Sequence, residues 1–490
     1  MSKWIHKAVL QVLASFILVV VLATTIQTRS VSLPPNVLKV YNYDRGISSQ
    51  YIGACEGNGD FKRSDLLDLN INTYRIYGGM SRWEATDDDG IYGYPTIAQI
   101  KADPNSINWE WWDTVMTYPE NGTDYNFSAP SDRVWQGNAR DLFRTLKENQ
   151  IRPVVTLRNS DPEWQPEWAT QLNPPDSDAD WNEWWEHVFA TVYWFNVRND
   201  YRVDDWEVHN EPNNLDQGWG GSQDEYFELM RVTQEAIAYV YQTYLPDRTY
   251  HIHAPTTTGG SSWPAATLNE VPEYFDSVNV HDYEADVSSY IQQVRSWMQP
   301  SIHAHSPLWL GEWGTYTTGY DDLGFSLNLI QNLIRMSQPG SHYVDGSHLF
   351  PLYNWEGEKG FEGLIDTDGR HRLSYYAFRM GIRALQGGKP VLLSTLSQSN
   401  DNLLAIATRD IDRQINLLLV NSTTAPAPMV IDIATLVSNG NAIVREFSAT
   451  AQDAIVANLP IMNGSMTFDL PRQTAWLLRL EAESESAEIR

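Results

Sequence analysis

The chain has 490 residues, 42% of them hydrophobic and 20% charged, which suits one large globular domain and a smaller second one. Its formal net charge of −28 argues against nucleic acid and other strongly anionic polymers as partners and favours a neutral ligand. The single cysteine, Cys55, excludes an intrachain disulfide.

Residues 1–29 resemble an export signal peptide or an N-terminal membrane anchor. Lys3, His6 and Lys7 form a basic start, and an apolar run follows from Ala8 to Ala23. No strong small-x-small cleavage site follows the run, so both interpretations stay open. We therefore expect a secreted or cell-surface protein, and the absence of disulfides favours a bacterial source.

A linker or edge strand is expected at residues 30–49, and from residue 50 short apolar runs alternate with amphipathic helical patterns. Eight runs are predicted to be strands: Tyr51–Ala54, Thr73–Tyr77, Arg152–Leu157, Asp205–Val208, Tyr250–His253, Ser277–His281, Leu308–Leu310 and Ser347–Leu352. Helices are predicted, among others, at Trp181–Phe195, Glu225–Tyr244, Phe325–Met336 and Ser374–Leu385. Eight strands alternating with helices predict an α/β protein with a (β/α)8 TIM barrel over residues 50–387.

After the Gly387-Gly388 pair the pattern changes to strands alone, separated by turn residues. These strands are predicted at Val391–Ser394, Leu403–Thr408, Ile415–Asn421, Met429–Ile433, Ala442–Ser448, Ser465–Asp469 and Thr474–Leu480. They indicate a C-terminal all-β sandwich domain at residues 388–480, followed by a flexible tail at 481–490.

Two glutamates stand where a barrel of this kind carries its functional groups, at the C-terminal ends of strands. Glu211 follows the fourth predicted strand and Glu312 follows the seventh, so they face each other across the barrel mouth. Two opposed carboxyls can protonate a leaving oxygen and meet an oxocarbenium-like centre, which is what hydrolysis of a glycosidic bond requires. A lone glutamate would more simply be a solvated loop carboxylate or a helix-capping anion. Here Asn210 offers an amide that can bind a sugar hydroxyl, and Pro212 fixes the backbone after the acid.

The sequence around both glutamates resembles a known family signature. Asn210, Glu211 and Pro212 on strand four, with Gly-Glu-Trp around Glu312 on strand seven, are similar to the motifs of clan A retaining glycoside hydrolases. The resemblance covers roughly residues 50–386 and implies that Glu211 is the acid/base and Glu312 the nucleophile. The layout of a barrel followed by a sandwich is most similar to family 39, the β-xylosidase and α-L-iduronidase group.

Further positions match the same clan and imply a substrate-binding set. These are Arg75 on strand two, beneath the nucleophile, His281 and Tyr283 on strand six, and Trp355 after strand eight, as the floor of the sugar site. Asn159 and Trp313 are candidate rim contacts. Tyr283 is expected to donate a hydrogen bond to the nucleophile. The simpler alternatives are a buried ion pair for Arg75 and ordinary core packing for His281 and Tyr283.

Other functional classes fit less well. A metal-dependent hydrolase would need converging ligands, and His251 and His253, which share one face of strand five, have no partners that complete a site. A serine hydrolase would need a Gly-x-Ser-x-Gly elbow. A catalytically silent carbohydrate-binding protein would not need two opposed carboxyls.

The sequence therefore predicts an exported retaining glycosidase that uses no metal or cofactor and cleaves β-linked neutral saccharides, such as a β-xyloside or a related plant or microbial polysaccharide. Two alternatives use the same barrel: an endo-acting β-glucanase or β-mannanase, and a transglycosylase.

Overall fold

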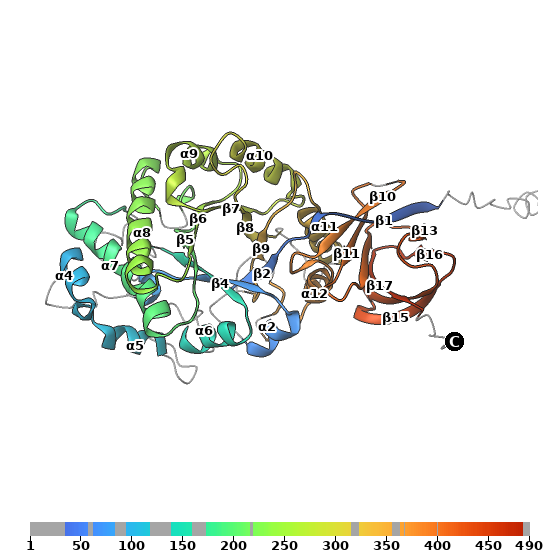
Figure 1. The fold of residues 1–490 in the computed structure, drawn as a ribbon, viewed down its shortest axis with the longest axis horizontal. Coiled ribbons are helices and arrows are strands. Elements are labelled where there is room, and N and C mark those ends of the chain that lie inside the picture. The colour runs from blue at the N-terminus through green and yellow to red at the C-terminus, as the bar shows by residue number, and fades with distance from the viewer. Residues whose placement is uncertain are drawn as a thin grey trace, which may run out of the picture.

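The computed structural model describes residues 35–56, 62–83, 95–117, 139–158, 173–215, 219–314, 323–354, 363–366, 368–398 and 400–483. Within these ranges the chain forms two domains that lie side by side (Figure 1). The predicted export segment lies outside the described residues. None of the helices described is long and apolar enough to span a membrane.

The larger domain is a closed barrel of eight parallel strands, which confirms the predicted fold class. Its strands are β2 (Tyr51–Cys55), β3 (Thr73–Tyr77), β4 (Arg152–Leu157), β5 (Asp205–Val208), β6 (His251–Thr257), β7 (Ser277–Asp282), β8 (Leu308–Trp313) and β9 (Gly346–Leu349). Each strand pairs with its neighbours in chain order, and β2 also pairs with β9, which closes the barrel.

Helices surround the barrel strands (Figure 1). They are α2 (Arg63–Leu69), α3 (Met80–Trp83), α4 (Ile97–Ala102), α5 (Trp109–Thr117), α6 (Ala139–Glu148), α7 (Asp178–Tyr193), α8 (Gln223–Tyr244), α9 (Trp263–Glu270), α10 (Ser288–Met298), α11 (Leu323–Ser337) and α12 (Leu373–Leu385). Ser177 and Ser222 begin α7 and α8 with capping boxes, each accepting a backbone N–H three residues on.

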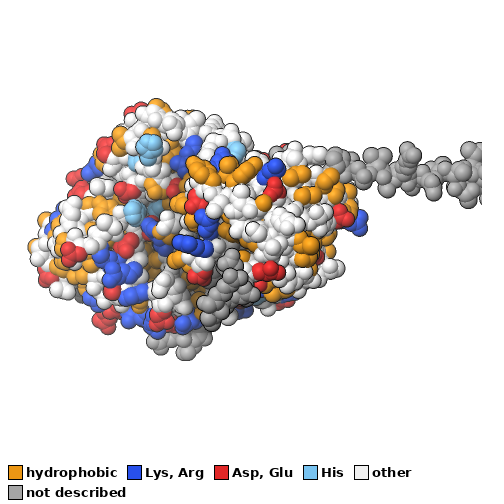
Figure 2. All heavy atoms as spheres, turned by 45° about the vertical axis from the view of Figure 1, so that its right-hand side comes forward, with side chains coloured by type: hydrophobic (Ala, Val, Ile, Leu, Met, Phe, Trp, Pro, Cys, Tyr) orange, Lys and Arg blue, Asp and Glu red, His pale blue; other side chains and the backbone are white. Residues whose placement is uncertain are grey.

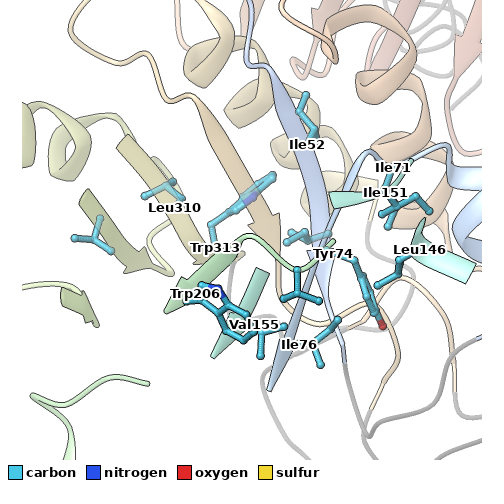
Figure 3. Close-up of a cluster of buried hydrophobic side chains, with 14 of the residues drawn as sticks. Ile52, Ile71, Tyr74, Ile76, Leu146, Ile151, Val155, Trp206, Leu310 and Trp313 are labelled. Atoms are coloured by element: carbon cyan, nitrogen blue, oxygen red, sulfur yellow. The ribbon is translucent and has the colours of Figure 1, made fainter. Parts of the chain in front are cut away.

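Side chains alternate between the two faces of each barrel strand. Tyr74, Ile76 and Trp206 are fully buried and contribute to the apolar layer between strands and helices (Figure 3). Their neighbours Arg75 and Glu207 are equally buried, and they contact each other across the barrel interior. The alternation therefore puts the hydrophobic core outside the strands and a polar layer inside them.

The second domain is a nine-stranded sheet that wraps around its own hydrophobic core. Its order is β15-β14-β17-β12-β11-β10-β1-β13-β16. The strands are β1 (Asn36–Ile47), β10 (Pro390–Leu396), β11 (Leu403–Arg409), β12 (Ile415–Asn421), β13 (Ala427–Asp432), β14 (Gly440–Phe447), β15 (Gln452–Ile461), β16 (Ser465–Leu470) and β17 (Thr474–Ala482). Residues of β1, β12, β13, β14 and β16 share this core, as expected of a sandwich.

Strand β1 corrects the prediction of a linker or edge strand at 30–49. It lies between β10, to which it is antiparallel, and β13, to which it is parallel, so it is an internal strand of the second domain. Leu38 and Val40 are buried in that domain's core. The second domain is therefore assembled from both ends of the described chain.

The two domains meet where α11 and α12 pack against the second sheet (Figure 1). Asp453 on β15 is buried and accepts hydrogen bonds from Arg379 Nε at 3.0 Å and Arg383 Nε at 3.1 Å, both on α12. The domain contact is thus partly ionic and is anchored on one buried carboxylate. Elsewhere, on the face shown in Figure 2, side chains of both charge signs are interspersed over the barrel.

Candidate active site

The two predicted carboxyls meet at the C-terminal end of the barrel. Glu312 is the penultimate residue of β8, and Glu211 lies just beyond β5. A carboxylate oxygen of each lies within 4.8 Å of the other, and the residues are 3% and 6% exposed. The structure thus brings together the pair that the sequence placed on strands four and seven.

A β-bulge directs Glu312 into the barrel. Val280 pairs with Leu310, but His281 pairs with Glu312, so β8 carries one extra residue, Gly311, at this point. A Cβ at Gly311 would lie 2.3 Å from Oδ1 of Asn279, which only glycine avoids. The bulge lets Glu312 point inward beside His281.

Backbone strain accompanies the placement of Glu211. His209 and Glu211 have φ values of 65° and 45°, which are unusual for residues with a side chain. Both backbones are held by neighbouring strands, since His209 N–H donates to Leu157 at 2.7 Å and Glu211 N–H donates to Thr256 at 2.9 Å. Strain that the surrounding structure holds in place is a common property of functional sites.

Glu312 is held by one cation and two hydroxyls. Nη1 of Arg75 donates to its Oε1 at 2.6 Å, Tyr77 donates to the same oxygen, and Tyr283 donates to Oε2. Burial by itself would raise the pKa of the Glu312 carboxyl. The charges of His281 and Arg75 and the two tyrosine hydrogen bonds outweigh burial and hold this pKa below its ordinary value. Glu312 is therefore kept as an anion, which a nucleophile must be.

His281 lies between the two carboxylates. Its Nδ1 is 2.9 Å from Oε1 of Glu211 and 3.7 Å from Oε2 of Glu312. Oε2 of Glu211 accepts a hydrogen bond from Asn214 at 3.0 Å. Glu211 thus has a different environment from Glu312, because among the described residues no arginine or lysine pairs with it. Two carboxyls in unlike surroundings can take different roles.

The remaining predicted residues have mixed outcomes. Asn210 is 1% exposed, and its Oδ1 accepts a hydrogen bond from Nη2 of Arg75 at 2.8 Å. Trp313 is wrong as a rim contact: its side chain is fully buried among hydrophobic residues and packs 6.2 Å from Phe378 of α12 (Figure 3). It follows the inward-pointing Glu312 and therefore points outward. Asn159 and Trp355 lie outside the described residues.

The sequence analysis missed two side chains that belong to this cluster. Tyr77 contacts Glu312, and Glu207 accepts a hydrogen bond from Nε of Arg75 at 2.6 Å. The alternation of a strand places both side chains inside the barrel, because Tyr77 follows Arg75 by two residues on β3 and Glu207 is an inward position of β5, but it does not show which partners they have.

Glu211, His281 and Glu312 carry donor atoms close enough together to hold a metal ion. However, Arg75 and the two tyrosine hydroxyls already bind both oxygens of Glu312. A metal cation here would have to share Glu312 with the Arg75 guanidinium, whose positive charge repels it. Of the histidine pair His251 and His253 that the sequence analysis weighed as metal ligands, His253 contacts a different carboxylate: its Nε2 lies 2.9 Å from Asp205 at the start of β5.

Comparisons with known proteins found a relative over part of the chain and solved structures of the same fold. No family model matches the chain. Over 121 residues it is 29% identical to a β-xylosidase from Caldicellulosiruptor saccharolyticus, a match that covers 24% of this chain and 23% of that enzyme. The match thus spans about a quarter of the relative.

Solved structures resemble the chain over nearly its whole length. A glucosidase from Croceicoccus marinus has a TM-score of 0.67 at 13% identity, covering 92% of this chain and 100% of that one. A GH39 β-xylosidase from Caulobacter crescentus has a TM-score of 0.62 at 17% identity, covering 91% and 99%. A GH39 enzyme from Xanthomonas axonopodis pv. citri has a TM-score of 0.61 at 16% identity, covering 94% and 100%. At these identities the likeness establishes the fold. In sequence motifs and in fold, the chain resembles the clan A glycoside hydrolases, including those of family 39.

Proposed function

We propose that the protein is a retaining glycoside hydrolase in which Glu312 is the nucleophile and Glu211 the acid/base. The observation that carries the proposal is the approach of the two carboxylates to within 4.8 Å. Retaining enzymes hold their carboxyls about 5–5.5 Å apart, whereas inverting enzymes leave about 6.5–9.5 Å for a water molecule. The spacing favours double displacement.

In the first step Oε2 or Oε1 of Glu312 attacks the anomeric carbon while Glu211 gives its proton to the leaving oxygen. The glycosidic bond breaks, and an ester between Glu312 and the sugar forms. In the second step Glu211 takes a proton from water, the resulting hydroxide attacks the anomeric carbon, and the ester breaks. Both residues return to their starting protonation states. Arg75, Tyr77 and Tyr283 stabilise Glu312 when it leaves as a carboxylate.

The proposed substrate is a neutral β-linked saccharide, with a β-xyloside or a related plant or microbial polysaccharide first. The relative with 29% identity is a β-xylosidase, and so is one of the similar solved structures. The net charge of −28 also suits an uncharged ligand better than an anionic one. Endo action on β-glucan or β-mannan and transglycosylation remain alternatives on the same barrel. A panel of aryl β-glycosides and cell-wall polysaccharides separates them.

We also propose that the protein is exported and acts at the cell surface or outside the cell. Its basic start and the apolar run from Ala8 to Ala23 support this. Fractionation of bacteria that express the full chain tests it: the protein is expected outside the cytoplasm, and removal of residues 1–29 is expected to retain it inside.

Azide tests the assigned roles. With a dinitrophenyl β-glycoside, Glu211→Ala still forms the glycosyl-enzyme because the leaving group needs no acid, and azide then gives a β-glycosyl azide. Glu312→Ala loses turnover by at least about 10⁴-fold, and azide gives no β-glycosyl product with it. A β-azide from Glu312→Ala and an inverted azide from Glu211→Ala would exchange the two roles. Saccharide binding without any turnover by the unmodified protein would instead indicate a silent carbohydrate-binding protein.

A further inference from the structure

One buried arginine is shared by two carboxylates beneath the proposed nucleophile. Arg75 is fully buried; its Nε donates to Oε2 of Glu207 at 2.6 Å, and its Nη1 donates to Oε1 of Glu312 at 2.6 Å. The guanidinium is planar, so these two contacts fix its orientation as well as its position. Glu312 is therefore linked to Glu207 through a single cation.

Glu207 is held rigidly and away from solvent. It is 0% exposed, and besides Arg75 it accepts hydrogen bonds from Thr156 Oγ1 at 2.7 Å and from Asn279 Nδ2 at 2.5 Å. These three donors come from β3, β4 and β7, so the carboxylate is tied to three other strands of the barrel. A fully buried group placed behind Arg75 acts on the reaction through Arg75, not by touching the sugar.

The charge balance indicates what Glu207 does. A buried pair of Arg75 and Glu312 alone would be neutral, and a fully neutralised carboxylate is a weaker nucleophile and a poorer partner for a developing positive centre. With Glu207 present, one guanidinium serves two anions. The cluster of Glu207, Arg75 and Glu312 therefore holds one negative charge that Arg75 does not offset, beside the place where the oxocarbenium-like centre would form.

We propose that Glu207 is a positioning residue that orients Arg75 and shares its charge, so that Glu312 stays both aligned and nucleophilic. This inference rests on the proposed function. It concerns a residue that no motif of the sequence singled out, and it predicts effects on Glu312 that ordinary packing would not produce.

Several ionisable groups face Glu312 and must stay constant in any test. They are Cys55 on β2, Arg75 and Tyr77 on β3, Glu207 and Glu211 from β5 and the segment after it, His281 and Tyr283 from β7 and the residue after it, and His348 on β9 behind Arg75. Of these groups only Glu207 is changed below. A shift in the Glu312 titration can then be assigned to it.

The decisive variant is Glu207→Gln, which keeps the shape and removes the charge. Asn279 can reverse its amide to accept from the new side chain, because its Oδ1 has no hydrogen-bond partner among the described residues. Arg75 then serves Glu312 alone. The rate of glycosyl-enzyme formation is expected to fall about 10- to 100-fold, with KM changing less than kcat. The acid limb of kcat/KM is expected to move to lower pH, because loss of a nearby negative charge lowers the pKa of Glu312.

A matched control lies on the same strand. Asp205→Asn is also an acid-to-amide change at a buried position of β5, but its partners are Arg152 and His253 at the start of the strands. It is expected to lower stability while leaving the acid limb and the rate per folded molecule unchanged. Glu207→Asp keeps the charge but withdraws it by one methylene, so it is expected to show the Glu207→Gln changes at smaller size, and it carries the test should Glu207→Gln not fold.

A direct titration separates this inference from the proposed function. The Glu312 carboxyl can be followed by infrared difference spectra against the same protein carrying Glu312→Gln, without any substrate. A titration that moves to lower pH in Glu207→Gln supports the inference even if no glycoside is turned over. Unchanged titration and an unchanged glycosylation rate in a folded Glu207→Gln protein would overturn it. Absence of turnover in the unmodified protein would overturn the proposed function alone.

Discussion

The two ends of the barrel interior pair their buried carboxylates with arginine in different ways. At the start of the strands Arg152 binds one carboxylate, Asp205, so positive and negative charge are matched. At the end of the strands Arg75 is divided between Glu207 and Glu312. Arg152 and Asp205 come from neighbouring strands, whereas Arg75 reaches across the barrel interior to both of its partners, and both arrangements are largely buried. Matched charge serves stability, whereas unmatched negative charge marks the end where chemistry is proposed.

The difference has an energetic reason. A buried carboxylate without a full share of positive charge is costly, and hydrogen bonds must offset the cost. At the proposed active site Tyr77, Tyr283 and Thr156 supply such hydrogen bonds. At the other end His253 and Arg152 hold the pKa of Asp205 below its ordinary value although burial opposes this. Three variants and one matched control can break or sharpen the contrast.

The largest effect is expected for Arg75→Met. The change leaves Glu207 and Glu312 buried without their cation, so the free energy of unfolding should fall by about 3–5 kcal/mol and kcat/KM by about 10³-fold. Urea unfolding and steady-state kinetics on an aryl β-glycoside measure the two losses. Loss of stability without loss of activity per folded molecule would mean that this arginine is only structural.

Tyr283→Phe tests the active-site end alone. Its hydroxyl donates to Glu312 and helps to lower the pKa of that carboxyl, so its loss should raise the pKa and move the acid limb of kcat/KM to higher pH. The sign is opposite to that expected for Glu207→Gln. A decrease in kcat of roughly 10- to 100-fold should accompany the shift.

The matched control for that variant is Tyr241→Phe. The hydroxyl of Tyr241 on α8 donates to Asp204 at 2.6 Å, just before the start of β5, whereas Glu312 lies near the end of β8. Its pH–rate profile should equal that of the unmodified protein. A shifted profile would show that the two ends are electrostatically coupled, and the contrast between them would have to be abandoned.

Apart from the control Tyr241→Phe, the smallest effect is expected for Arg152→Met. Arg152 is 26% exposed at its side chain, and Asp205 keeps His253 as a partner, so the free energy of unfolding should fall by only about 2 kcal/mol. The kcat of the folded fraction should stay within about twofold, measured after active-site titration. A tenfold loss of kcat at unchanged folding would contradict a purely stabilising role for this end.

Much of the barrel could be predicted because its strands are short apolar runs between loops. The bounds of β3, β4 and β5 agree with the sequence prediction at both ends. Strand β8 was expected to end at Leu310 but continues to Trp313, because the glycine bulge and the charged Glu312 look like the start of a loop. The same bulge explains the error at Trp313, since the alternation of sides restarts after the extra residue.

Strand β1, expected only as a linker or edge strand, and strand β15, for which no strand is predicted, differ from the sequence prediction for another reason. Seven consecutive residues of β1 and much of β15 are exposed, so neither shows a regular alternation of apolar residues. The partner of β1 is far along the chain: Leu38 pairs with Leu396. Local pattern holds no information about pairing over such a distance.

The candidate site could be predicted only where a motif carried it. Glu211 and Glu312 were found because each stands beside recognisable neighbours after an apolar strand. Glu207 has no such context, and its contact with Arg75 joins residues 132 positions apart. A single carboxylate within a strand can be identified as buried and paired only once the closed barrel shows what lies opposite.

The central position of β1 has a consequence for synthesis and for engineering. This strand leaves the ribosome before the barrel, yet its partners β10 and β13 follow only after α12. The backbone N–H and C=O groups of β1 therefore have no strand partner while the barrel is translated. An unpaired strand edge of this kind can pair with another chain and aggregate. Truncation after α12 would leave the same edge open permanently. A stable isolated barrel therefore requires removal of β1 as well, and a transplantable second domain requires β1 joined to the start of β10 by a new loop.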